Sequence, residues 1–222
     1  MNAVQFVKTL KSLNFENTFN PYSNTCEIFD TVDAASQRAE ILLEMLEAAS
    51  KSKVDAIWIA RDLGHRGGRR TGLALTDDVH IEAHAKRWGV KAKRATKGSA
   101  VAERTSAIIW SMLSRINENI FLWNVFPLHP HEENEPFSNR LHNKFERAAG
   151  EELLENLISL LNPKRLIAIG NDAEKTAMRI SNGIPVYKVR HPSYGGHIQY
   201  TSQITQLYDL EEESQGKLQI QS

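Results

Sequence analysis

The feature that most constrains this chain is an apolar run at residues 54–60 that ends in a polar, glycine-rich loop. The run contains β-branched residues and a Trp, which is typical of a strand buried in a parallel sheet. Arg61 and Asp62 follow it, and residues 63–70 combine three glycines with one His and three Arg. In open α/β sheets, ligands bind beyond the carboxyl ends of the strands. We therefore expect a polyanion-binding site here, with a carboxylate beside it for acid–base chemistry.

Strand-like and helix-like segments alternate along the rest of the chain. Three further apolar runs indicate strands, at residues 119–125, 165–169 and 185–189. Apolar residues spaced three and four apart, or capping residues, indicate helices at 5–13, 33–50, 76–88, 101–116, 141–161, 171–180 and 197–210. The helix at 141–161 is expected to break near Gly150. This alternation predicts the α/β class: a three-layer αβα arrangement with a central four-stranded parallel sheet.

Length and cysteine content narrow the class of protein. A chain of 222 residues can bury the core of one α/β domain, which we place at residues 1–210, with a flexible tail at 211–222. The single cysteine, Cys26, excludes an internal disulfide and a Cys-ligated cluster. No apolar run is long enough to span a membrane, and no signal peptide is recognised. We expect a cytoplasmic protein with no membrane partner.

The charge is balanced overall but unevenly distributed. The formal net charge is zero, so the chain as a whole is not a basic nucleic-acid-binding protein. Residues 51–100, however, contain more than twice as many Lys and Arg as Asp and Glu. A charge run of this kind is either a solvated surface or a basic face that binds phosphates, and both interpretations remain open.

Polar residues stand at the ends of all four predicted strands. Asp62 ends the first, Asn124 lies near the end of the second, Gly170 and Asn171 follow the third, and His191 follows the fourth. Because the carboxyl ends of parallel strands meet at one edge of a sheet, these residues are expected to converge. The predicted site therefore contains a carboxylate, an amide, an imidazole and a helix N-terminus.

Several short motifs support one family. Residues 60–65 are Ala-Arg-Asp-Leu-Gly-His, residues 72–76 are Gly-Leu-Ala-Leu-Thr, residues 122–124 are Leu-Trp-Asn, and residues 191–193 are His-Pro-Ser. Their order and spacing resemble the uracil-DNA glycosylase superfamily, whose best-known branch has Gly-Gln-Asp-Pro-Tyr-His, Gly-Leu-x-Phe-Ser, Leu-Leu-Asn and His-Pro-Ser. The family's Trp-Gly turn before a helix is similar to residues 169–171 here. The resemblance extends from about residue 54 to residue 196.

The chain departs from that pattern at four places. Leu63 replaces a Pro, Gly64 replaces a Tyr, and Leu75 replaces the Phe that stacks on the flipped base. Residues 194–196, Tyr-Gly-Gly, replace the Pro-Leu-Ser that carries the family's wedge residue. The departures indicate a divergent member without an iron–sulfur cluster, and we expect no cofactor.

The resemblance implies three catalytic residues. Asp62 would orient the attacking water and favour a cation-like sugar, and His191 would donate a hydrogen bond to the base as negative charge develops on it. Asn124 would contact the Watson–Crick edge of a base flipped out of DNA. Each also has a structural interpretation: Asp62 as a turn cap, His191 as a support for the Pro192 turn, and Asn124 as a partner for backbone groups.

The base pocket is expected to contain five further residues. They are Arg61, Leu63, Gly64, His65 and Leu75. In the family branch with Tyr at the position of Gly64, the ring blocks groups attached to C5 of the pyrimidine. We hypothesise that Gly64 opens the pocket to C5-substituted pyrimidines or larger bases, unless another side chain fills the gap. Leu75 would cover one face of the base, or be an ordinary core residue.

DNA contacts are expected from three loop segments, one after each of three predicted strands. The candidates are Arg66, Arg69, Arg70, Gly170, Asn171, Ser193 and Tyr194. The arginines would bind flanking phosphates or polar groups on a bulky modified base, or be solvated surface residues. The helix N-terminus at Gly170 is suited to anions. Tyr194 is the nearest bulky side chain that could fill the space left by a flipped base, with simple packing as the alternative.

Metal chemistry is not expected. His129 and His131 stand in an acidic, proline-containing loop, but two histidines two residues apart are a weak zinc signal. The sequence thus predicts a monomeric, monofunctional DNA glycosylase that removes uracil or another aberrant base. Two alternatives stay open: a glycosylase for bulky C5-modified pyrimidines of phage DNA, acting in defence, and a non-catalytic nucleic-acid-binding module with the same fold.

Overall fold

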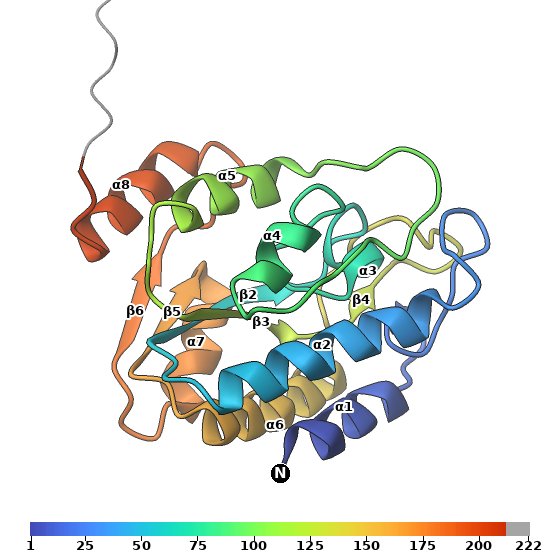
Figure 1. Cartoon of the computed structure of the whole chain (residues 1–222), viewed down its shortest axis with the longest axis horizontal. Coiled ribbons are helices and arrows are strands. Elements are labelled where there is room, and N and C mark those ends of the chain that lie inside the picture. The colour runs from blue at the N-terminus through green and yellow to red at the C-terminus, as the bar shows by residue number, and fades with distance from the viewer. Residues whose placement is uncertain (212–222) are drawn as a thin grey trace, which may run out of the picture.

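A four-stranded parallel sheet forms the centre of the molecule (Figure 1). The computed structural model describes residues 1–211. The strands lie in the order β3 (Ile120–Phe126), β2 (Ala56–Asp62), β5 (Arg165–Ile169) and β6 (Val186–Val189), and every neighbouring pair is parallel. Apolar runs with β-branched and aromatic residues form these strands because both faces of the sheet are covered. The predicted sheet is confirmed.

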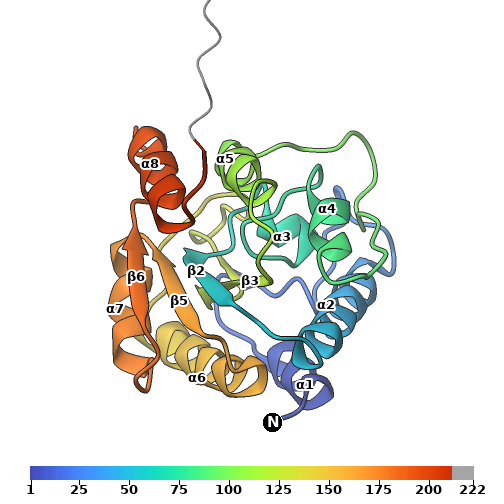
Figure 2. The same ribbon diagram turned by 60° about the vertical axis from the view of Figure 1, so that its left-hand side comes forward.

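Helices cover both faces of this sheet (Figure 2). One face packs against α1 (Ala3–Ser12), α2 (Ala34–Ser50), α6 (Lys144–Leu161) and α7 (Asn171–Ile180). The other face packs against α5 (Arg104–Leu113) and α8 (His197–Leu207). A short helix, α4 (Ile81–Lys86), contributes to the first cluster. The three-layer αβα prediction is therefore confirmed.

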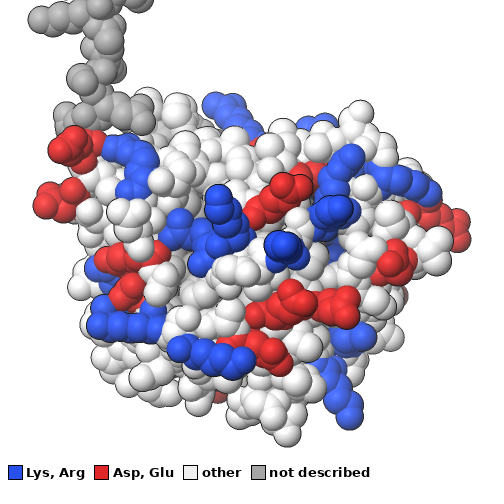
Figure 3. All heavy atoms as spheres, viewed as in Figure 1, with Lys and Arg blue, Asp and Glu red and all other residues white. Residues whose placement is uncertain are grey.

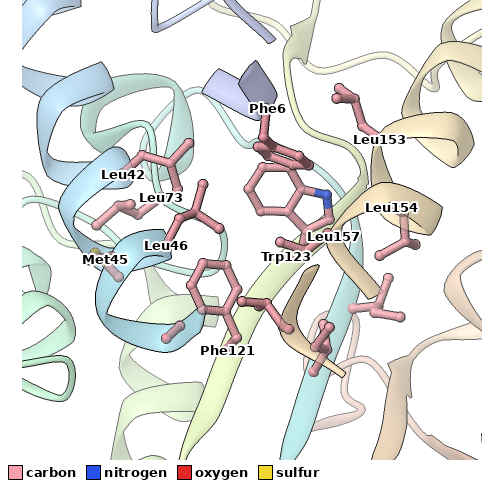
Figure 4. Close-up of a cluster of buried hydrophobic side chains, with 14 of the residues drawn as sticks. Phe6, Leu42, Met45, Leu46, Leu73, Phe121, Trp123, Leu153, Leu154 and Leu157 are labelled. Carbon is pink, nitrogen blue, oxygen red and sulfur yellow. The ribbon is translucent and has the colours of Figure 1, made fainter. Parts of the chain in front are cut away.

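Alternation along β3 divides its side chains between the two layers. Phe121 and Trp123 enter the larger apolar cluster, in which the Trp123 ring lies 5.4 Å from that of Phe6 (Figure 4). Ile120 and Leu122 enter the smaller cluster on the opposite face. Because side chains alternate along a strand, Asn124 projects to the same side as Ile120 and Leu122.

Helix α6 is continuous past Gly150, contrary to the predicted break. A Cβ atom at Gly150 would lie 2.1 Å from the backbone oxygen of Val125 in β3. The glycine is thus required for close packing of the helix on the strand rather than for a helix end. Glycine inside a helix is an ambiguous signal because both causes produce it.

Three short elements were not predicted. Strand β1 (Thr18–Phe19) pairs antiparallel with β4 (His129–Pro130), and the single-turn helix α3 (Gly68–Thr71) lies in the glycine-rich loop. Each is too short to produce a periodic pattern, so only the packing of distant segments defines it. Strand β2 also extends two residues beyond the predicted end, so that Asp62 is its last residue.

The described part of the chain contains no helix long and apolar enough to cross a membrane. Nearly all of the predicted tail, residues 212–222, lies outside the described residues.

Candidate active site

A cleft of about 620 Å³ opens at the carboxyl ends of the strands. Asp62 at the end of β2, Gly170 after β5 and His191 after β6 all line it. These three positions converge because the strands are parallel and in register, as the strand ends predicted. Of the predicted site residues, those that line the cleft are Arg61, Asp62, Leu63, Gly64, Leu75, Gly170, Asn171, His191, Ser193 and Tyr194.

The carboxylate of Asp62 is held on both oxygens. The Arg61 side chain donates from Nε to Oδ2 at 2.7 Å, and the His142 ring donates from Nδ1 to Oδ1. The Asp62 side chain is only 6% exposed, although it lines the cleft. A carboxylate oxygen accepts more than one hydrogen bond, so these two donors orient the group and leave it able to bind a water molecule.

His142 is the main functional candidate that the sequence did not reveal. Its ring is buried between two carboxylates: Nδ1 contacts Asp62, and Nε2 lies 3.3 Å from Oδ2 of Asp172 in α7. Asp172 is paired in turn with Arg147 of α6. The helical pattern of residues 141–161 placed His142 inside a helix, whereas α6 begins at Lys144. The one sequence feature that indicated a position outside the helix is that His142 directly precedes the capping residue Asn143.

The tautomer of His191 follows from its neighbours. Burial, with Arg61 and Arg190 nearby, lowers the pKa of His191 to about 4, so the ring is neutral at pH 7. The backbone N–H of Ser193 donates to Nδ1 at 3.2 Å, and the Ser193 hydroxyl lies 2.7 Å from the same atom. Because Nδ1 accepts, Nε2 carries the hydrogen of the neutral ring. His191 therefore presents an N–H donor without a positive charge.

Asn124 lies beneath this cleft rather than on its lining. The side chain is buried, and its carbonyl oxygen Oδ1 has no hydrogen-bond partner among the described residues. Leu75, whose carbonyl accepts a hydrogen bond from the Trp110 indole, belongs to the cluster on the same side of the sheet. An unpaired buried acceptor typically costs about 1–3 kcal/mol, so Asn124 is suited to a ligand that supplies a donor.

Glu103, another residue that the sequence did not single out, occupies much of the space beside Gly64. A Cβ atom added at Gly64 would lie 3.1 Å from Oε1 of Glu103, and one at Gly67 would lie 2.3 Å from Oε2. The gap left by Gly64 is thus partly filled by a carboxyl group. Glu103 precedes α5 by one residue and lines the cleft.

Arg69 and Arg70 are not on the surface, which contradicts their predicted role in DNA binding. Arg69 is buried, lies 3.9 Å above the Phe19 ring and donates to the backbone oxygen of Pro136. Arg70 is buried, and its Nε and Nη2 both donate to Oδ2 of Asp78, at 2.9 and 2.7 Å. Both residues hold the glycine-rich loop in place. The residue types in the loop do not distinguish a buried supporting arginine from one that contacts a phosphate.

The other predicted DNA contacts remain accessible. Arg66 is exposed, and Tyr194 is 99% exposed at a backbone φ of 50°. Arg190, which was not predicted, lines the cleft beside His191. His65 lies outside the cleft lining and pairs with Asn139, whose Oδ1 accepts from the His65 backbone at 3.0 Å. On the face shown in Figure 3, basic and acidic side chains are interspersed, so that face is neither predominantly positive nor predominantly negative.

Within residues 1–211, no three His, Cys, Asp or Glu side chains are grouped so as to hold a metal ion. His129 instead packs beside Arg69, with 3.1 Å between Nδ1 and Nη1, and burial lowers the pKa of His129 to about 3.

The fold was compared with those of solved structures. The structure is similar to the crystal structure of Pedobacter heparinus SMUG2, with a TM-score of 0.58 and 16% identity over 93% of this chain and 92% of that one. A mimivirus UNG variant in complex with UGI aligns with a TM-score of 0.39 and 14% identity, over 86% of this chain and 69% of that one. No curated protein matches the sequence.

A family-level match covers more than half of the chain. The profile described as the uracil DNA glycosylase superfamily matches residues 70–205. The match includes Asn124, His142 and His191 but begins after Asp62, whose role therefore depends on its geometry. The four-stranded sheet, the cleft at its carboxyl edge and this match together lead to one conclusion: the chain belongs to the uracil DNA glycosylase superfamily.

Proposed function

We propose that this protein is a monofunctional DNA glycosylase that hydrolyses the N-glycosidic bond of uracil or another aberrant base flipped out of DNA. One observation carries the proposal: a carboxylate oriented by Arg61 and His142 shares a cleft with a neutral His191 that presents Nε2–H. The reaction needs a positioned water at the sugar and a donor at the leaving base, and these residues supply both.

The mechanism assigns one task to each group. Asp62 orients a water molecule toward C1′ and stabilises the positive charge that develops on the sugar. As the C1′–N bond breaks, its electron pair moves onto the base, and His191 donates a hydrogen bond from Nε2 to a base oxygen. A preorganised donor of this type typically contributes about 3 kcal/mol. The water oxygen bonds to C1′, and its proton passes to the Asp62 carboxylate.

Base recognition and DNA contacts complete the proposal. Asn124 would receive a hydrogen bond from the base at its unpartnered Oδ1, and Leu75 would cover one face of the ring. Tyr194, fully exposed at the rim, would fill the space that the flipped nucleotide leaves in the duplex. No Lys is among the described residues that line the cleft, which favours simple hydrolysis over a Schiff-base step.

The second candidate is a glycosylase for bulky C5-modified pyrimidines, such as those of phage DNA, acting in defence. The cleft volume of about 620 Å³ and the absence of a side chain at Gly64 favour it. It uses the same catalytic groups, so only the substrate distinguishes it from the first proposal.

A base-release assay tests both candidates. The assay compares wild type with Asp62→Asn and with a control, Asp33→Asn, which changes an exposed carboxylate. The substrates are modified phage DNA and oligonucleotides that contain uracil, hypoxanthine, mismatched thymine or C5-modified cytosine. Abasic sites would be detected by alkaline cleavage. We expect Asp62→Asn to lose at least about 100-fold in rate and Asp33→Asn to match wild type, because a positioned acid–base group contributes about 10²–10⁴.

The substrate that reacts decides between the candidates. Release of uracil supports a repair-type enzyme, and release only from modified DNA supports the second candidate. A complete lack of release from every substrate would contradict both and favour a nucleic-acid-binding module.

A further inference from the structure

Glu103 lines the cleft, and the proposed catalytic step does not use its carboxyl group. Its Oε1 is the nearest atom to the space beside Gly64, on the side of the cleft formed by the glycine-rich loop. Its Oε2 occupies the space beside Gly67. With Glu103 in this position, a side chain at Gly67 would collide with its carboxyl group, and one at Gly64 would crowd it. The loop is therefore shaped around Glu103.

Two hydrogen bonds position Glu103, one at its backbone and one at its carboxyl group. The backbone N–H of Glu103 donates to Oδ2 of Asp77 at 2.7 Å, and the Ser106 hydroxyl donates to Oε2 at 3.0 Å. Asp77 is itself buried and bonded to His80. Oε2 thus accepts a hydrogen bond from Ser106, whereas Oε1 lies beside Gly64, which lines the cleft. A fixed group loses little entropy on binding a ligand, as expected for a recognition residue.

This carboxyl group forms no ion pair among the described residues. Arg66 of the same loop is exposed, and its positive charge favours the ionised form of Glu103 less than burial favours the neutral form. Burial and the Asp77 carboxylate raise the pKa of Glu103. A half-buried carboxyl group of this kind accepts a hydrogen bond from a ligand that carries a donor. In its ionised form it repels a ligand that brings a carbonyl or carboxylate oxygen to the same place.

We propose that Glu103 is a specificity residue that selects bases bearing an amine or hydroxyl group on the edge that faces Gly64. Among C5-substituted pyrimidines, the favoured substrate class is therefore one with a hydrogen-bond donor on its C5 substituent, rather than one with a carbonyl or carboxylate group there. The inference depends on the proposed function, in which C5 of the bound base points to Gly64. It also narrows the hypothesis that Gly64 opens the pocket to C5-substituted pyrimidines. With Glu103 beside Gly64, the hydrogen-bonding groups of a C5 substituent decide binding as well as its size.

Binding tests this inference separately from turnover. The Asp62→Asn protein, which lacks the proposed catalytic carboxylate, would be compared with Asp62→Asn/Glu103→Gln. The duplexes would carry one 5-methyluracil, 5-hydroxymethyluracil, 5-aminomethyluracil or 5-carboxyuracil, and dissociation constants would be measured by fluorescence anisotropy. We expect 5-aminomethyluracil DNA to bind about tenfold or more tightly than 5-methyluracil DNA, and 5-carboxyuracil DNA most weakly, because hydrogen bonds to charged groups are the strong ones.

The double variant provides the comparison. Glu103→Gln keeps the volume of the side chain and removes its charge, so the preference should shrink to about threefold or less. The matched control Asp62→Asn/Glu155→Gln, which changes an exposed carboxylate of α6, should keep the full preference.

The outcomes separate this inference from the proposed function. Equal affinity for the 5-methyl and 5-aminomethyl duplexes would overturn the role of Glu103, even if wild-type protein releases bases. A preserved preference in the double variant would overturn it as well. A preference that depends on Glu103 in a protein that releases no base would support the recognition role and contradict the glycosylase proposal alone.

Discussion

At the scale of single residues, His142 determines how Asp62 is presented to the cleft. Its Nδ1 donates to the carboxylate, and its Nε2 faces Asp172. We predict that His142→Ala lowers kcat by on the order of 100-fold with little change in KM, because the carboxylate loses its orienting donor. His142→Asn places an amide N–H near the former Nδ1 and should recover most of this loss. Steady-state kinetics of base release would measure both.

The two variants distinguish orientation from charge. Equal losses in His142→Ala and His142→Asn would contradict an orienting role and indicate that the link to Asp172 matters instead. Far-ultraviolet circular dichroism of both variants would show whether the fold is kept.

His191 links the site to stability. The pKa of about 4 in the folded protein lies below the ordinary value of 6.5, so between these pH values the unfolded chain binds more protons. The free energy of unfolding must then fall as pH decreases from 6.5 to 4. We predict that His191→Gln makes this decline shallower, by on the order of 2 kcal/mol between pH 7 and pH 4.5.

Urea unfolding at the two pH values measures this effect. His84 and His129, both with pKa lowered to about 3 by burial, titrate in the same direction, so the comparison of variant and wild type isolates His191. An unchanged slope in the variant would show that the pKa of His191 is not lowered in the folded state.

At the scale of elements, the contact of α6 with β3 depends on Gly150. Helix propensity alone predicts that Gly150→Ala stabilises the protein by about 0.5–1 kcal/mol. The 2.1 Å approach of an added Cβ to the Val125 oxygen predicts the opposite, a loss of about 1–3 kcal/mol from overpacking. Chemical denaturation of the variant decides between them by the sign of the change. A more stable variant would contradict the close packing of helix on strand.

Elements differ in how well the sequence predicts them. Strand β5 has the predicted bounds, and α2 begins one residue later than predicted, because their apolar patterns are long and regular. The start of α6 differs by three residues because its cap, Asn143, is defined by hydrogen bonds to Phe145 and Glu146. The spacing of apolar residues carries no information about such capping hydrogen bonds. This difference of three residues is why His142 was assigned to a helix rather than to the site.

At the scale of the whole molecule, the parallel sheet brings distant residues to one edge. Asp62 and His142 are 80 positions apart in the chain, and Glu103 lies 39 positions after Gly64. The cleft is the space that remains where β2, β5 and β6 end and the helices diverge. A site of this kind can change its substrate through a loop residue such as Glu103 while Asp62 and His191 stay in place.

The sequence by itself determined the class of fold, the order of the strands along the chain and the strand-end residues Asp62, Gly170 and His191. Hydrophobic periodicity and strand ends are local properties of the sequence, so they can be predicted from it directly. The tertiary structure alone decided which arginines reach solvent, and it showed Arg69 and Arg70 to be buried supports. It also decided what surrounds the catalytic candidates, since the partners of a side chain depend on how distant segments pack, and no local pattern records that packing.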